Sequence, residues 1–590
     1  MTDIVVTFLL ENLTRLLTQE AKLLYGVEDQ VGLLKNDLSL INVFLQKTAG
    51  NRHDNLVKVL VSQIRDVAYE AEDVIDTFIL TETEHRKRNF LGQAIHSYDR
   101  ISALHKVANE IERIKNVMNE INNNMSKYGI EISESSGANT EAAKILHRRR
   151  RYVEEDHVVG FGHDTQALMK QLTEGSLQLN VVSIIGMGGL DVNLSPMSKS
   201  RRISIHHANR LCISSNHCEP SNIRSLIGFG GVAGHESPLD KLWESNKLVR
   251  VVDLRNMGIC CLIPKSIENM TLLRYLSIRS NKLHVIPESI CNLWNLETMD
   301  MRNFDSAKEG GKSTIQCLPK GIWKLQKLRH LYMDGPTSLP RTGNQAGLPN
   351  LQVLTGIAID QDSESLFAKA RFPNVRKLGL FSLKAVDSEL LSSLHPLHEL
   401  QTLKIYKHFK LSSPTSFQLS LTKITLVDAD LSEAIIRVLG CLTNLRILKA
   451  VTARADHVYM DISLNLNESS FSKLEVLKMV HMHVLQWTMA KGAMPSLQRL
   501  VIERCLFVCL PPVELWSLPG LQDVEVLHPC SKFANVLQQL QTRDGRKFQV
   551  YPPLDPTMLM PKGQCSSILS IGSGFAVQCL TNHFGCGNQA

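Results

Sequence analysis

The chain lacks several features that identify common classes of protein. Aromatic residues make up only 6% of its 590 residues, and no uncharged apolar stretch reaches membrane-spanning length. The N-terminus has Asp3 and Glu11 around a short apolar run and no basic segment before it, so it does not resemble a secretory signal. The net charge of +7 is small for this length and gives no sign of nucleic-acid binding. We therefore expect a multidomain protein of the cytoplasm.

A catalytic or metal-binding set is also missing. No nucleophile, base and acid occur at a known spacing, so we expect no catalytic residues and no enzyme. The thirteen cysteines are scattered. Cys505 and Cys509 come nearest to a ligand pair but have no partner pair downstream, and Cys260 and Cys261 are adjacent, a poor spacing for one metal. We expect no metal site, and interpret most cysteines as buried small hydrophobic residues in a reducing compartment.

One stretch begins a nucleotide site without completing it. The apolar run at 181–185 is typical of a buried strand. Three glycines follow it, as in a loop whose N–H groups bind phosphate: Gly186, Gly188 and Gly189. A working P-loop next needs a lysine for the phosphates and a hydroxyl for Mg²⁺. Those places hold Asp191, Val192 and Asn193. We therefore expect no bound cofactor.

Residues 1–130 have the composition of a helical domain. They contain no proline and little glycine, and Leu, Lys, Glu and Gln are frequent. Helices are expected over about 3–24, 28–48, 54–82 and 95–127. Apolar residues recur every three or four positions in the third helix: Val57, Leu60, Ile64, Val67, Ala71, Val74 and Phe78. That spacing predicts one buried face with coiled-coil-like packing.

Acidic residues occupy other faces of the third helix. They are Asp66, Glu70, Glu72, Asp73 and Asp76, and a solvated helix face would explain them. The string Glu72–Asp76, late in the third of four N-terminal helices, resembles the signature of the coiled-coil domain of plant coiled-coil, nucleotide-binding, leucine-rich-repeat disease resistance proteins. The resemblance implies that this motif contacts basic residues of the repeats. It also implies that the helical domain self-associates or pairs with intact relatives, with peripheral association at the plasma membrane.

The resemblance continues as far as the incomplete phosphate loop. The segment at 158–164 and the loop Gly186–Leu190 match the start of the family's nucleotide-binding domain, which holds ADP or ATP in intact members. The match then stops, and Ser200–His206 resembles the segment beyond that domain. About fifty residues cannot enclose a nucleotide or bury the core of an α/β domain. We interpret 131–205 as a linker with a truncated remnant of the domain, and 206–240 as a pre-repeat segment.

A repeating frame, Leu-x-x-Leu-x-Leu, covers residues 241–528. It begins, with substitutions, at Val249, Leu273, Leu296, Leu328, Leu351, Val375, Leu400, Leu421, Leu445, Leu474, Leu497 and Leu521. Most steps have the length of a leucine-rich repeat, and two long ones, from Leu296 and from Leu445, indicate loop insertions. Ile-Pro or Leu-Pro pairs should break the convex side. Each repeat should add one strand to a parallel sheet on a concave face, which binds large ligands and provides no enzyme pocket by itself.

One position of the frame, directly after the first apolar residue, is repeatedly basic. It holds Arg250, Arg274, Arg329, Arg376 and Arg446. Stacked across the repeats, these arginines would form a basic stripe near the sheet. Our hypothesis pairs the first three with the acidic signature of the third helix, Glu72, Asp73 and Asp76. The alternative is solvated arginines, because exposed ion pairs contribute only ~0–1 kcal/mol.

The expected architecture is an N-terminal α-helical module of the four-helix, coiled-coil type joined to a C-terminal α/β leucine-rich-repeat solenoid. Residues 529–590 are expected to be a disordered tail, apart from one short helix at about 533–541.

The resemblance implies the function of a plant immune receptor. The repeats would recognise pathogen effectors or guarded host proteins, and the coiled-coil domain would signal or regulate. Two alternatives stay open: a nucleotide-dependent ADP/ATP switch of the NTPase class, if the missing core exists in the true product, and a non-functional truncated gene product.

Overall fold

The computed structural model describes the N-terminal helices, most of the repeats and a C-terminal cap. The described residues are 4–19, 21–24, 26–47, 55–87, 97–127, 201–205, 223–229, 247–257, 263–279, 285–302, 316–341, 347–382, 393–407, 420–429, 431–452, 459–544 and 549–551. The incomplete phosphate loop with Gly186, Gly188 and Gly189 lies outside the described residues, as does everything after residue 551.

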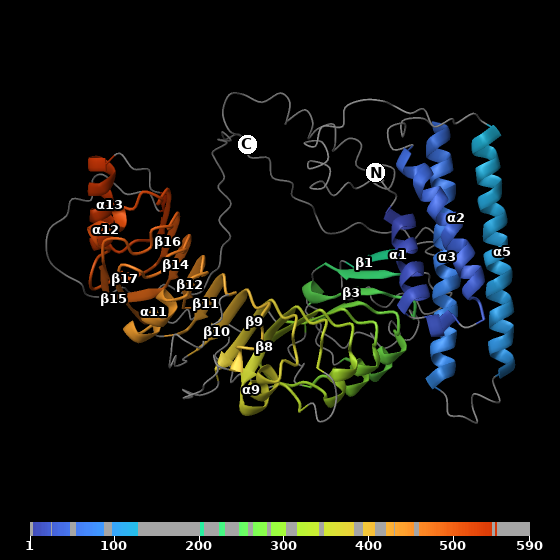
Figure 1. Ribbon diagram of the computed structural model, residues 1–590, viewed down its shortest axis with the longest axis horizontal. Helices are drawn as coiled ribbons and strands as arrows, with labels where there is room; N and C mark the ends of the chain where they lie inside the picture. The colour runs from blue at the N-terminus through green and yellow to red at the C-terminus, as the bar shows by residue number, and fades with distance from the viewer. Residues whose placement is uncertain are drawn as a thin grey trace, which may run out of the picture.

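The N-terminal module is a bundle of long helices packed side by side (Figure 1). Its described elements are α1 (Ile4–Gln19), η1 (Ala21–Leu24), α2 (Glu28–Lys47), α3 (Asn55–Lys87) and α5 (Ser97–Lys127). The four predicted helices are confirmed, and α3 continues five residues past its predicted end at 82. Of the seven apolar positions predicted for its buried face, six are buried and Val74 is half-buried against the same core.

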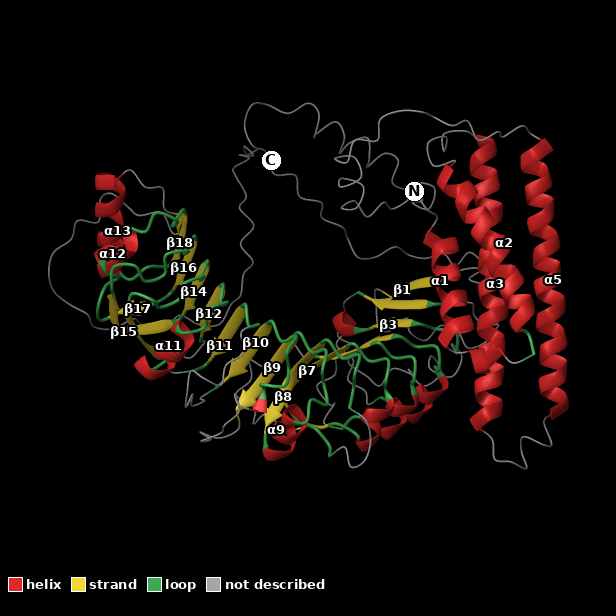
Figure 2. Cartoon of the chain, viewed as in Figure 1, coloured by secondary structure: helices red, strands yellow, loops and turns green. Residues whose placement is uncertain are grey.

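The repeats form one long parallel sheet that lines the concave side of an arc, with short helices on the convex side (Figure 2). In spatial order its strands are β1 (Arg202–Ile205), β2 (Ser225–Gly228), β3 (Val251–Asp253), β4 (Tyr275–Ser277), β5 (Thr298–Met301), β7 (His330–Ser338), β8 (Val353–Ile359), β9 (Lys377–Ser382), β10 (Thr402–Tyr406), β11 (Lys423–Val427), β12 (Ile447–Val451), β14 (Val476–Val480), β16 (Arg499–Glu503), β18 (Asp523–Leu527) and β19 (Gln549–Tyr551), while β6 (Gln316–Cys317) pairs with β7.

The predicted repeat frame is confirmed at all twelve positions. Each strand from β3 to β18 on this path begins two residues after the predicted start, as Val251 follows Val249 and Asp523 follows Leu521. The second and third apolar positions of the frame, such as Val252 and Leu254, point into the core and are fully buried. The residues between them face the concave side, which explains the alternating burial along each strand.

The sheet extends past both predicted ends of the repeats. Strands β1 and β2 pair in parallel with each other and with β3, so the boundary at 241 and the separate pre-repeat segment at 206–240 are wrong. The frame at Ile223 and Leu226 has Gly228 at its third apolar position, which hid it from the sequence pattern. At the other end, α13 (Ser531–Asp544) and β19 close the sheet, so residues 531–544 and 549–551 are not a disordered tail.

The convex side changes along the arc. After Pro264, Pro287 and Pro319 the chain forms the 3₁₀ helices η7 (Lys265–Asn269), η8 (Glu288–Asn292) and η9 (Lys320–Lys324), as the predicted Ile-Pro and Leu-Pro breaks require. Another short 3₁₀ helix, η6 (Arg255–Met257), follows β3. Later repeats carry α9 (Gln361–Ala368), α11 (Glu433–Gly440), α12 (Val513–Trp516) and a second sheet of β13 (Met460–Leu466), β15 (Met482–Met489) and β17 (Leu506–Phe507). The long step from Leu445 therefore contains strand β13 and is not only a loop insertion.

Five strands share an unusual exit. The residue directly after each strand has a positive φ of 49–68°, although none of the five is glycine: Lys407, Asp428, His481, Arg504 and His528. Each donates its backbone N–H to the carbonyl of the last residue of the next strand, as Arg504 does to Leu527 at 2.8 Å. These hydrogen bonds connect successive repeats at the C-terminal ends of their strands.

Candidate docking site between the helices and the repeats

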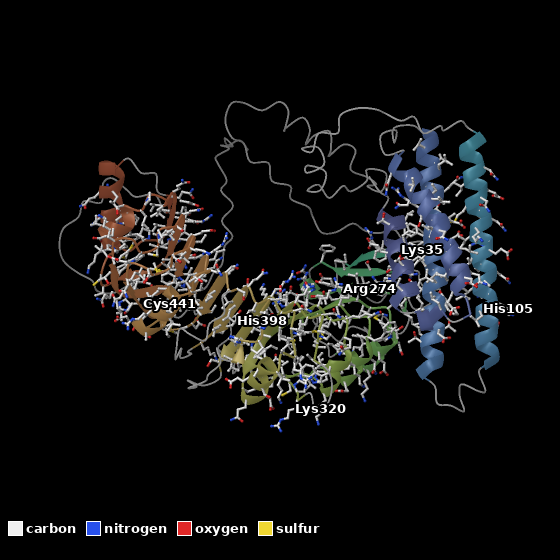
Figure 3. The ribbon with its side chains drawn as sticks, in the orientation of Figure 1. Lys35, His105, Arg274, Lys320, His398 and Cys441 are labelled. Atoms are coloured by element: carbon white, nitrogen blue, oxygen red, sulfur yellow. The ribbon has the colours of Figure 1, made fainter. Side chains whose placement is uncertain are left out.

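Four arginines stand in one column at the entrance of the first four strands. They are Arg201, Arg224, Arg250 and Arg274, each directly before its strand. The backbone N–H of each donates to the carbonyl of the preceding one at 2.8–2.9 Å, so the register of the sheet stacks them. The helical module covers this end of the sheet, and Figure 3 shows Arg274 at the junction of the two parts. We call these four residues the arginine column.

The acidic residues that face the column lie on one side of α3. Glu72 and Asp76 are one helical turn apart and are both buried, and Asp73 beside them is partly buried. Arg250 lies between the two buried carboxylates. Its Nη2 donates to both carboxylate oxygens of Asp76 at 2.8 and 2.6 Å, and its Nη1 donates to Oε1 of Glu72. Because its two terminal nitrogens bind two different carboxylates, the position and orientation of the guanidinium are fixed.

The first two members of the column pair with the same helix. Arg201 reaches Oε2 of Glu72 and Oδ2 of Asp73, both at 2.7 Å, and donates to the backbone carbonyl of Tyr69 at 2.6 Å. Its guanidinium carbon lies 4.2 Å from the centre of the Tyr69 ring, a cation–π geometry. Arg224 donates from Nη2 to Oδ1 of Asp73 at 2.5 Å, and its Nε forms an ion pair with Oδ2 of Asp76 at 3.2 Å. Neither Nε nor Nη1 makes a hydrogen bond to a described residue.

The fourth member contacts α1 and no carboxylate of α3. Nη2 of Arg274 donates to Oδ1 of Asn12 at 2.7 Å, and Nη2 of Arg15 approaches the same oxygen at 3.5 Å. The Nδ2 of Asn12 is buried without a hydrogen-bond partner among the described residues. Phe8, also on α1, lies 5.2 Å from the guanidinium carbon of Arg250 and 5.6 Å from that of Arg274.

The rest of the basic stripe lies away from this contact. Arg329 is exposed, and its backbone N–H continues the ladder to Glu297. Arg376 and Arg446 form exposed ion pairs with Glu399 and Glu475 on neighbouring repeats. Of the three arginines in the hypothesis, the structure thus brings Arg250 to Glu72 and Asp76, Arg274 to Asn12, and Arg329 to none of the three acidic residues.

Burial and charge act against each other in this cluster. Desolvation raises the pKa of Asp73, although Arg224 and Arg201 counteract it. Desolvation also lowers the pKa of Arg224, more than Asp76 and Asp73 raise it. For Arg250 the balance is reversed, because the charges of Asp76 and Glu72 outweigh a large burial penalty and its pKa is raised. Burial, followed by the charges of Arg15 and Arg250, lowers the pKa of Arg274 to about 10.

Apolar side chains surround the charged cluster and continue the helical core onto the repeats. Leu272, which precedes β4, belongs to the same buried cluster as the module's core, and Leu248 packs against it. A small cavity between the parts is lined by Leu9 and Asn12 of α1, Ile75 of α3, and Arg274 and Trp294 of the repeats. The ion pairs are therefore largely shielded from water. In such a buried environment charge interactions are stronger than on the surface.

This arrangement can hold two domains together. Three carboxylates face three arginines, with no nucleophile between them. In the described part of the chain, no group of His, Cys, Asp or Glu could hold a metal ion. No helix there is long and apolar enough to cross a membrane.

The cysteines differ from our expectation. Of the six that are described, only Cys291 and Cys505 are buried, and burial raises the pKa of each thiol to about 12. Cys317, Cys441 and Cys509 are exposed. The prediction that most are buried is wrong for this part of the chain, because these three lie in turns and a strand at the surface.

Two family profiles match the chain in the regions that form this contact. The Rx N-terminal domain matches residues 5–100, and a leucine-rich repeat region matches residues 222–426. The second match begins just before β2, in agreement with the early start of the sheet.

Relatives at moderate identity carry names from plant defence. A late blight resistance protein homolog of Solanum demissum is 29% identical over 318 residues, which are 50% of this chain and 23% of the relative. A disease resistance protein of Arabidopsis thaliana is 29% identical over 217 residues, 36% of this chain and 25% of the relative. The chain thus spans about a quarter of the length of these relatives.

Among solved structures, a leucine-rich repeat protein of Leptospira interrogans aligns with 56% of this chain and 90% of its own, at 18% identity and a TM-score of 0.35. By these matches the chain is similar to plant disease resistance proteins, with an Rx N-terminal domain followed by a leucine-rich repeat region.

Proposed function

We propose that this chain is a cytoplasmic plant immune receptor-like protein whose helical module is held against the repeats until a protein ligand binds the repeats. Its ligand would be a pathogen effector or a guarded host protein, and its action is binding and regulation without catalysis. The observation that carries the proposal is the buried cluster of Glu72, Asp73 and Asp76 with Arg201, Arg224 and Arg250. A domain contact built this way favours one register, because each carboxylate lies between two arginines of the column and a shift of the helix would break several ion pairs at once.

The cluster suits reversible docking better than permanent joining. Buried ion pairs recover their desolvation cost only with good geometry, so a small displacement of α3 would lose most of their energy at once. A ligand that binds the repeats better when the helices are undocked would then shift the equilibrium. Freed helices could pair with intact relatives or act at the plasma membrane, both of which the family resemblance implies.

The test exchanges charges across the contact. Asp76→Arg and Arg250→Asp, made separately in the full chain, should each speed amide hydrogen exchange in α3, and the double variant should restore protection in part. Expression of the same variants in leaf tissue should change ion leakage, a measure of defence-related cell death, for the single variants only. Arg329→Asp is the matched control, because this arginine has the same place in its repeat but is exposed.

The two readouts separate docking from function. Unchanged exchange in both single variants would refute the docking, and leakage equal to empty vector for every variant would refute the immune role.

A further inference from the structure

The middle of the concave face carries four lysines and no carboxylate. Strands β9–β12 have twelve positions on that face, and the eight that are not lysine are uncharged. The charged ones are Lys377, Lys404, Lys423 and Lys449, one from each strand. The next strand adds Lys478, directly opposite Lys449 in the register. We call these five residues the lysine patch.

Both flanks of the patch are neutralised within the chain. On the N-terminal side, Asp253 and Asp300 are each paired with an arginine two residues later, Arg255 and Arg302, at 2.7 Å. On the C-terminal side, Arg499 contacts Asp523 at 3.3 Å and Glu525 at 2.8 Å. The lysine patch differs, because among the described residues only Lys478 of its five lysines forms an ion pair, with Glu503 at 3.4 Å on the border of the patch.

The lysines lie close enough to repel one another. Burial lowers the pKa of Lys377, and the charges of Arg302, Lys423 and Lys404 lower it further. Burial and the charges of Lys423, Lys478 and Arg499 lower the pKa of Lys449 in the same way. Like charges directly opposite on neighbouring strands destabilise a sheet. A partner that brings carboxylates would relieve this repulsion.

An aromatic surface adjoins the lysines. The rings of Phe381 and Tyr406, on neighbouring strands, stack with centres 4.0 Å apart and planes 4° from parallel. Both side chains are partly exposed, and Nζ of Lys404 lies 4.4 Å from the Tyr406 ring centre. Flat, rigid side chains of this kind contribute contact area at low entropic cost in protein interfaces. Their place beside the lysines favours a polypeptide over a bare polyphosphate chain.

We propose that the lysine patch and the Phe381–Tyr406 pair bind an acidic segment of a protein partner. This inference rests on the proposed receptor function and specifies its partner. Neighbouring strands are about 4.8 Å apart, so the four lysines of β9–β12 span about 14 Å across the sheet. An extended segment covers that distance in about four or five residues at ~3.3 Å each, and its side chains alternate between two faces. Two or three acidic residues at alternate positions of one short stretch can therefore each meet a lysine.

The experiment uses the full chain and a labelled peptide. The probe is a fluorescein-tagged 12-residue peptide with six glutamates at alternate positions and one tyrosine, compared with the same peptide carrying glutamines. Fluorescence anisotropy should detect the glutamate peptide only, and binding should weaken as NaCl rises from 50 to 300 mM because salt screens exposed charges.

Variants locate the site. Lys377→Glu, Lys423→Glu and Lys449→Glu together should weaken binding at least tenfold. Lys320→Glu, Lys369→Glu and Lys491→Glu together change the net charge equally at exposed positions outside the concave columns and should change affinity less than twofold. Phe381→Ala should weaken binding without altering its salt dependence.

Three outcomes would overturn the inference. They are equal losses in the two triple variants, equal binding of both peptides, and displacement of the peptide by inorganic polyphosphate with no loss on Phe381→Ala, which would make the patch a general polyanion surface. None of these concerns the contact between the helices and the repeats. Failure here with intact charge exchange at Asp76 and Arg250 would therefore leave the proposed function in place.

Discussion

At the scale of single residues, the docking contact has a well-paired centre and a poorly paired edge. Arg250 uses two nitrogens on two carboxylates, and its pKa is raised despite its burial. Arg224 is equally buried but satisfies only one nitrogen by a hydrogen bond, and its pKa is lowered. Two arginines in the same column, one strand apart, therefore contribute differently to docking.

Arg250→Met should weaken docking strongly, and Arg224→Met should weaken it less. Removing one partner of a buried ion pair leaves the other uncompensated and costs about 3–5 kcal/mol. The loss should be smaller at Arg224, because Arg224 makes one hydrogen bond to the carboxylates whereas Arg250 makes three. Hydrogen exchange in α3 gives the free energy of opening for each variant. Equal effects of the two substitutions would contradict this difference in pairing.

Asn12→Asp should strengthen docking of α1. The oxygen of Asn12 already accepts from Arg274 and faces Arg15, while its Nδ2 is buried without a partner. A carboxylate would place a charge between two arginines, raise the depressed pKa of Arg274, and remove the unsatisfied donor, a gain of about 1–3 kcal/mol for hydrogen bonds to charged groups. Slower amide hydrogen exchange in α1 would show the stronger docking. Asn12→Leu is the control and should accelerate exchange, since it leaves Arg274 unpaired.

The sequence indicated part of this contact. The repeat frame identified Arg250 as a residue of the stripe, because a register of period 23–24 fixes which side chains stack. It could not distinguish Arg250 from Arg329, because the frame does not say where along the sheet the helices lie. Arg201 and Arg224 were missed because their strands were assigned to segments outside the repeats. The Ile223–Arg224 pair, with Leu226 after it, was the available signal.

At the scale of elements, the strands were predictable and the ends of the sheet were not. The apolar frame is read from twelve copies, so a substitution in one copy does not hide it. A terminal element occurs once: α13 buries Phe533 and Leu537 completely, but two apolar residues one turn apart do not distinguish a cap from a short surface helix. An element that occurs once cannot be recognised by comparing it with other repeats of the same chain.

Phe533→Ala should destabilise only the C-terminal end of the arc. Its ring packs on Phe507 at 4.8 Å and on Trp516 at 6.4 Å between centres, and losing it leaves a cavity that costs about 3–5 kcal/mol. Because each repeat contacts mainly its neighbours, hydrogen exchange should rise in β16–β19 and stay unchanged in β3–β5. Lys532→Ala, exposed on the same helix, should change neither region. A uniform rise along the whole sheet would argue against this local coupling.

Arg504→Asn should stabilise the repeats. Its φ of 49° is a left-handed conformation that costs an ordinary side chain about 1–2 kcal/mol, whereas asparagine adopts it more readily. Since the backbone bond to Leu527 is kept, we expect a gain of about 0.5–1 kcal/mol. Thermal unfolding of the full chain measures it, with Lys491→Asn, exposed and without a positive φ, as control. A lower melting temperature for Arg504→Asn would mean that the arginine side chain itself contributes there.

At the scale of the whole molecule, the helices close one end of the sheet and α13 closes the other (Figure 1). Ends are where an open parallel sheet exposes unpaired backbone and apolar surface. The helical module therefore combines two roles at the N-terminal end: it covers Leu248 and Leu272, and it pairs the arginine column.

The purified chain should contain no bound nucleotide. The phosphate loop at Gly186, Gly188 and Gly189 is followed by Asp191, Val192 and Asn193, so neither the phosphate-binding lysine nor the magnesium hydroxyl is present. Heat denaturation followed by chromatography of the released nucleotides measures the content. One ADP per chain would contradict the expectation and favour the nucleotide-dependent switch.

The ion pairs between Glu72 and Arg201 join residues 129 positions apart in the sequence, so docking closes a loop through residues 128–200. A tether of that kind keeps the two surfaces at an effective concentration on the order of millimolar, and a contact too weak to hold two separate proteins can then hold two parts of one chain. The entropy of closing a loop grows only with the logarithm of its length, about 0.6 kcal/mol for each doubling. A connection four times longer would therefore weaken docking by only about 1.2 kcal/mol. The same contact can thus work with a short connection or with a whole domain inserted into it, whereas cutting the connection would turn docking into a bimolecular, dilution-sensitive event.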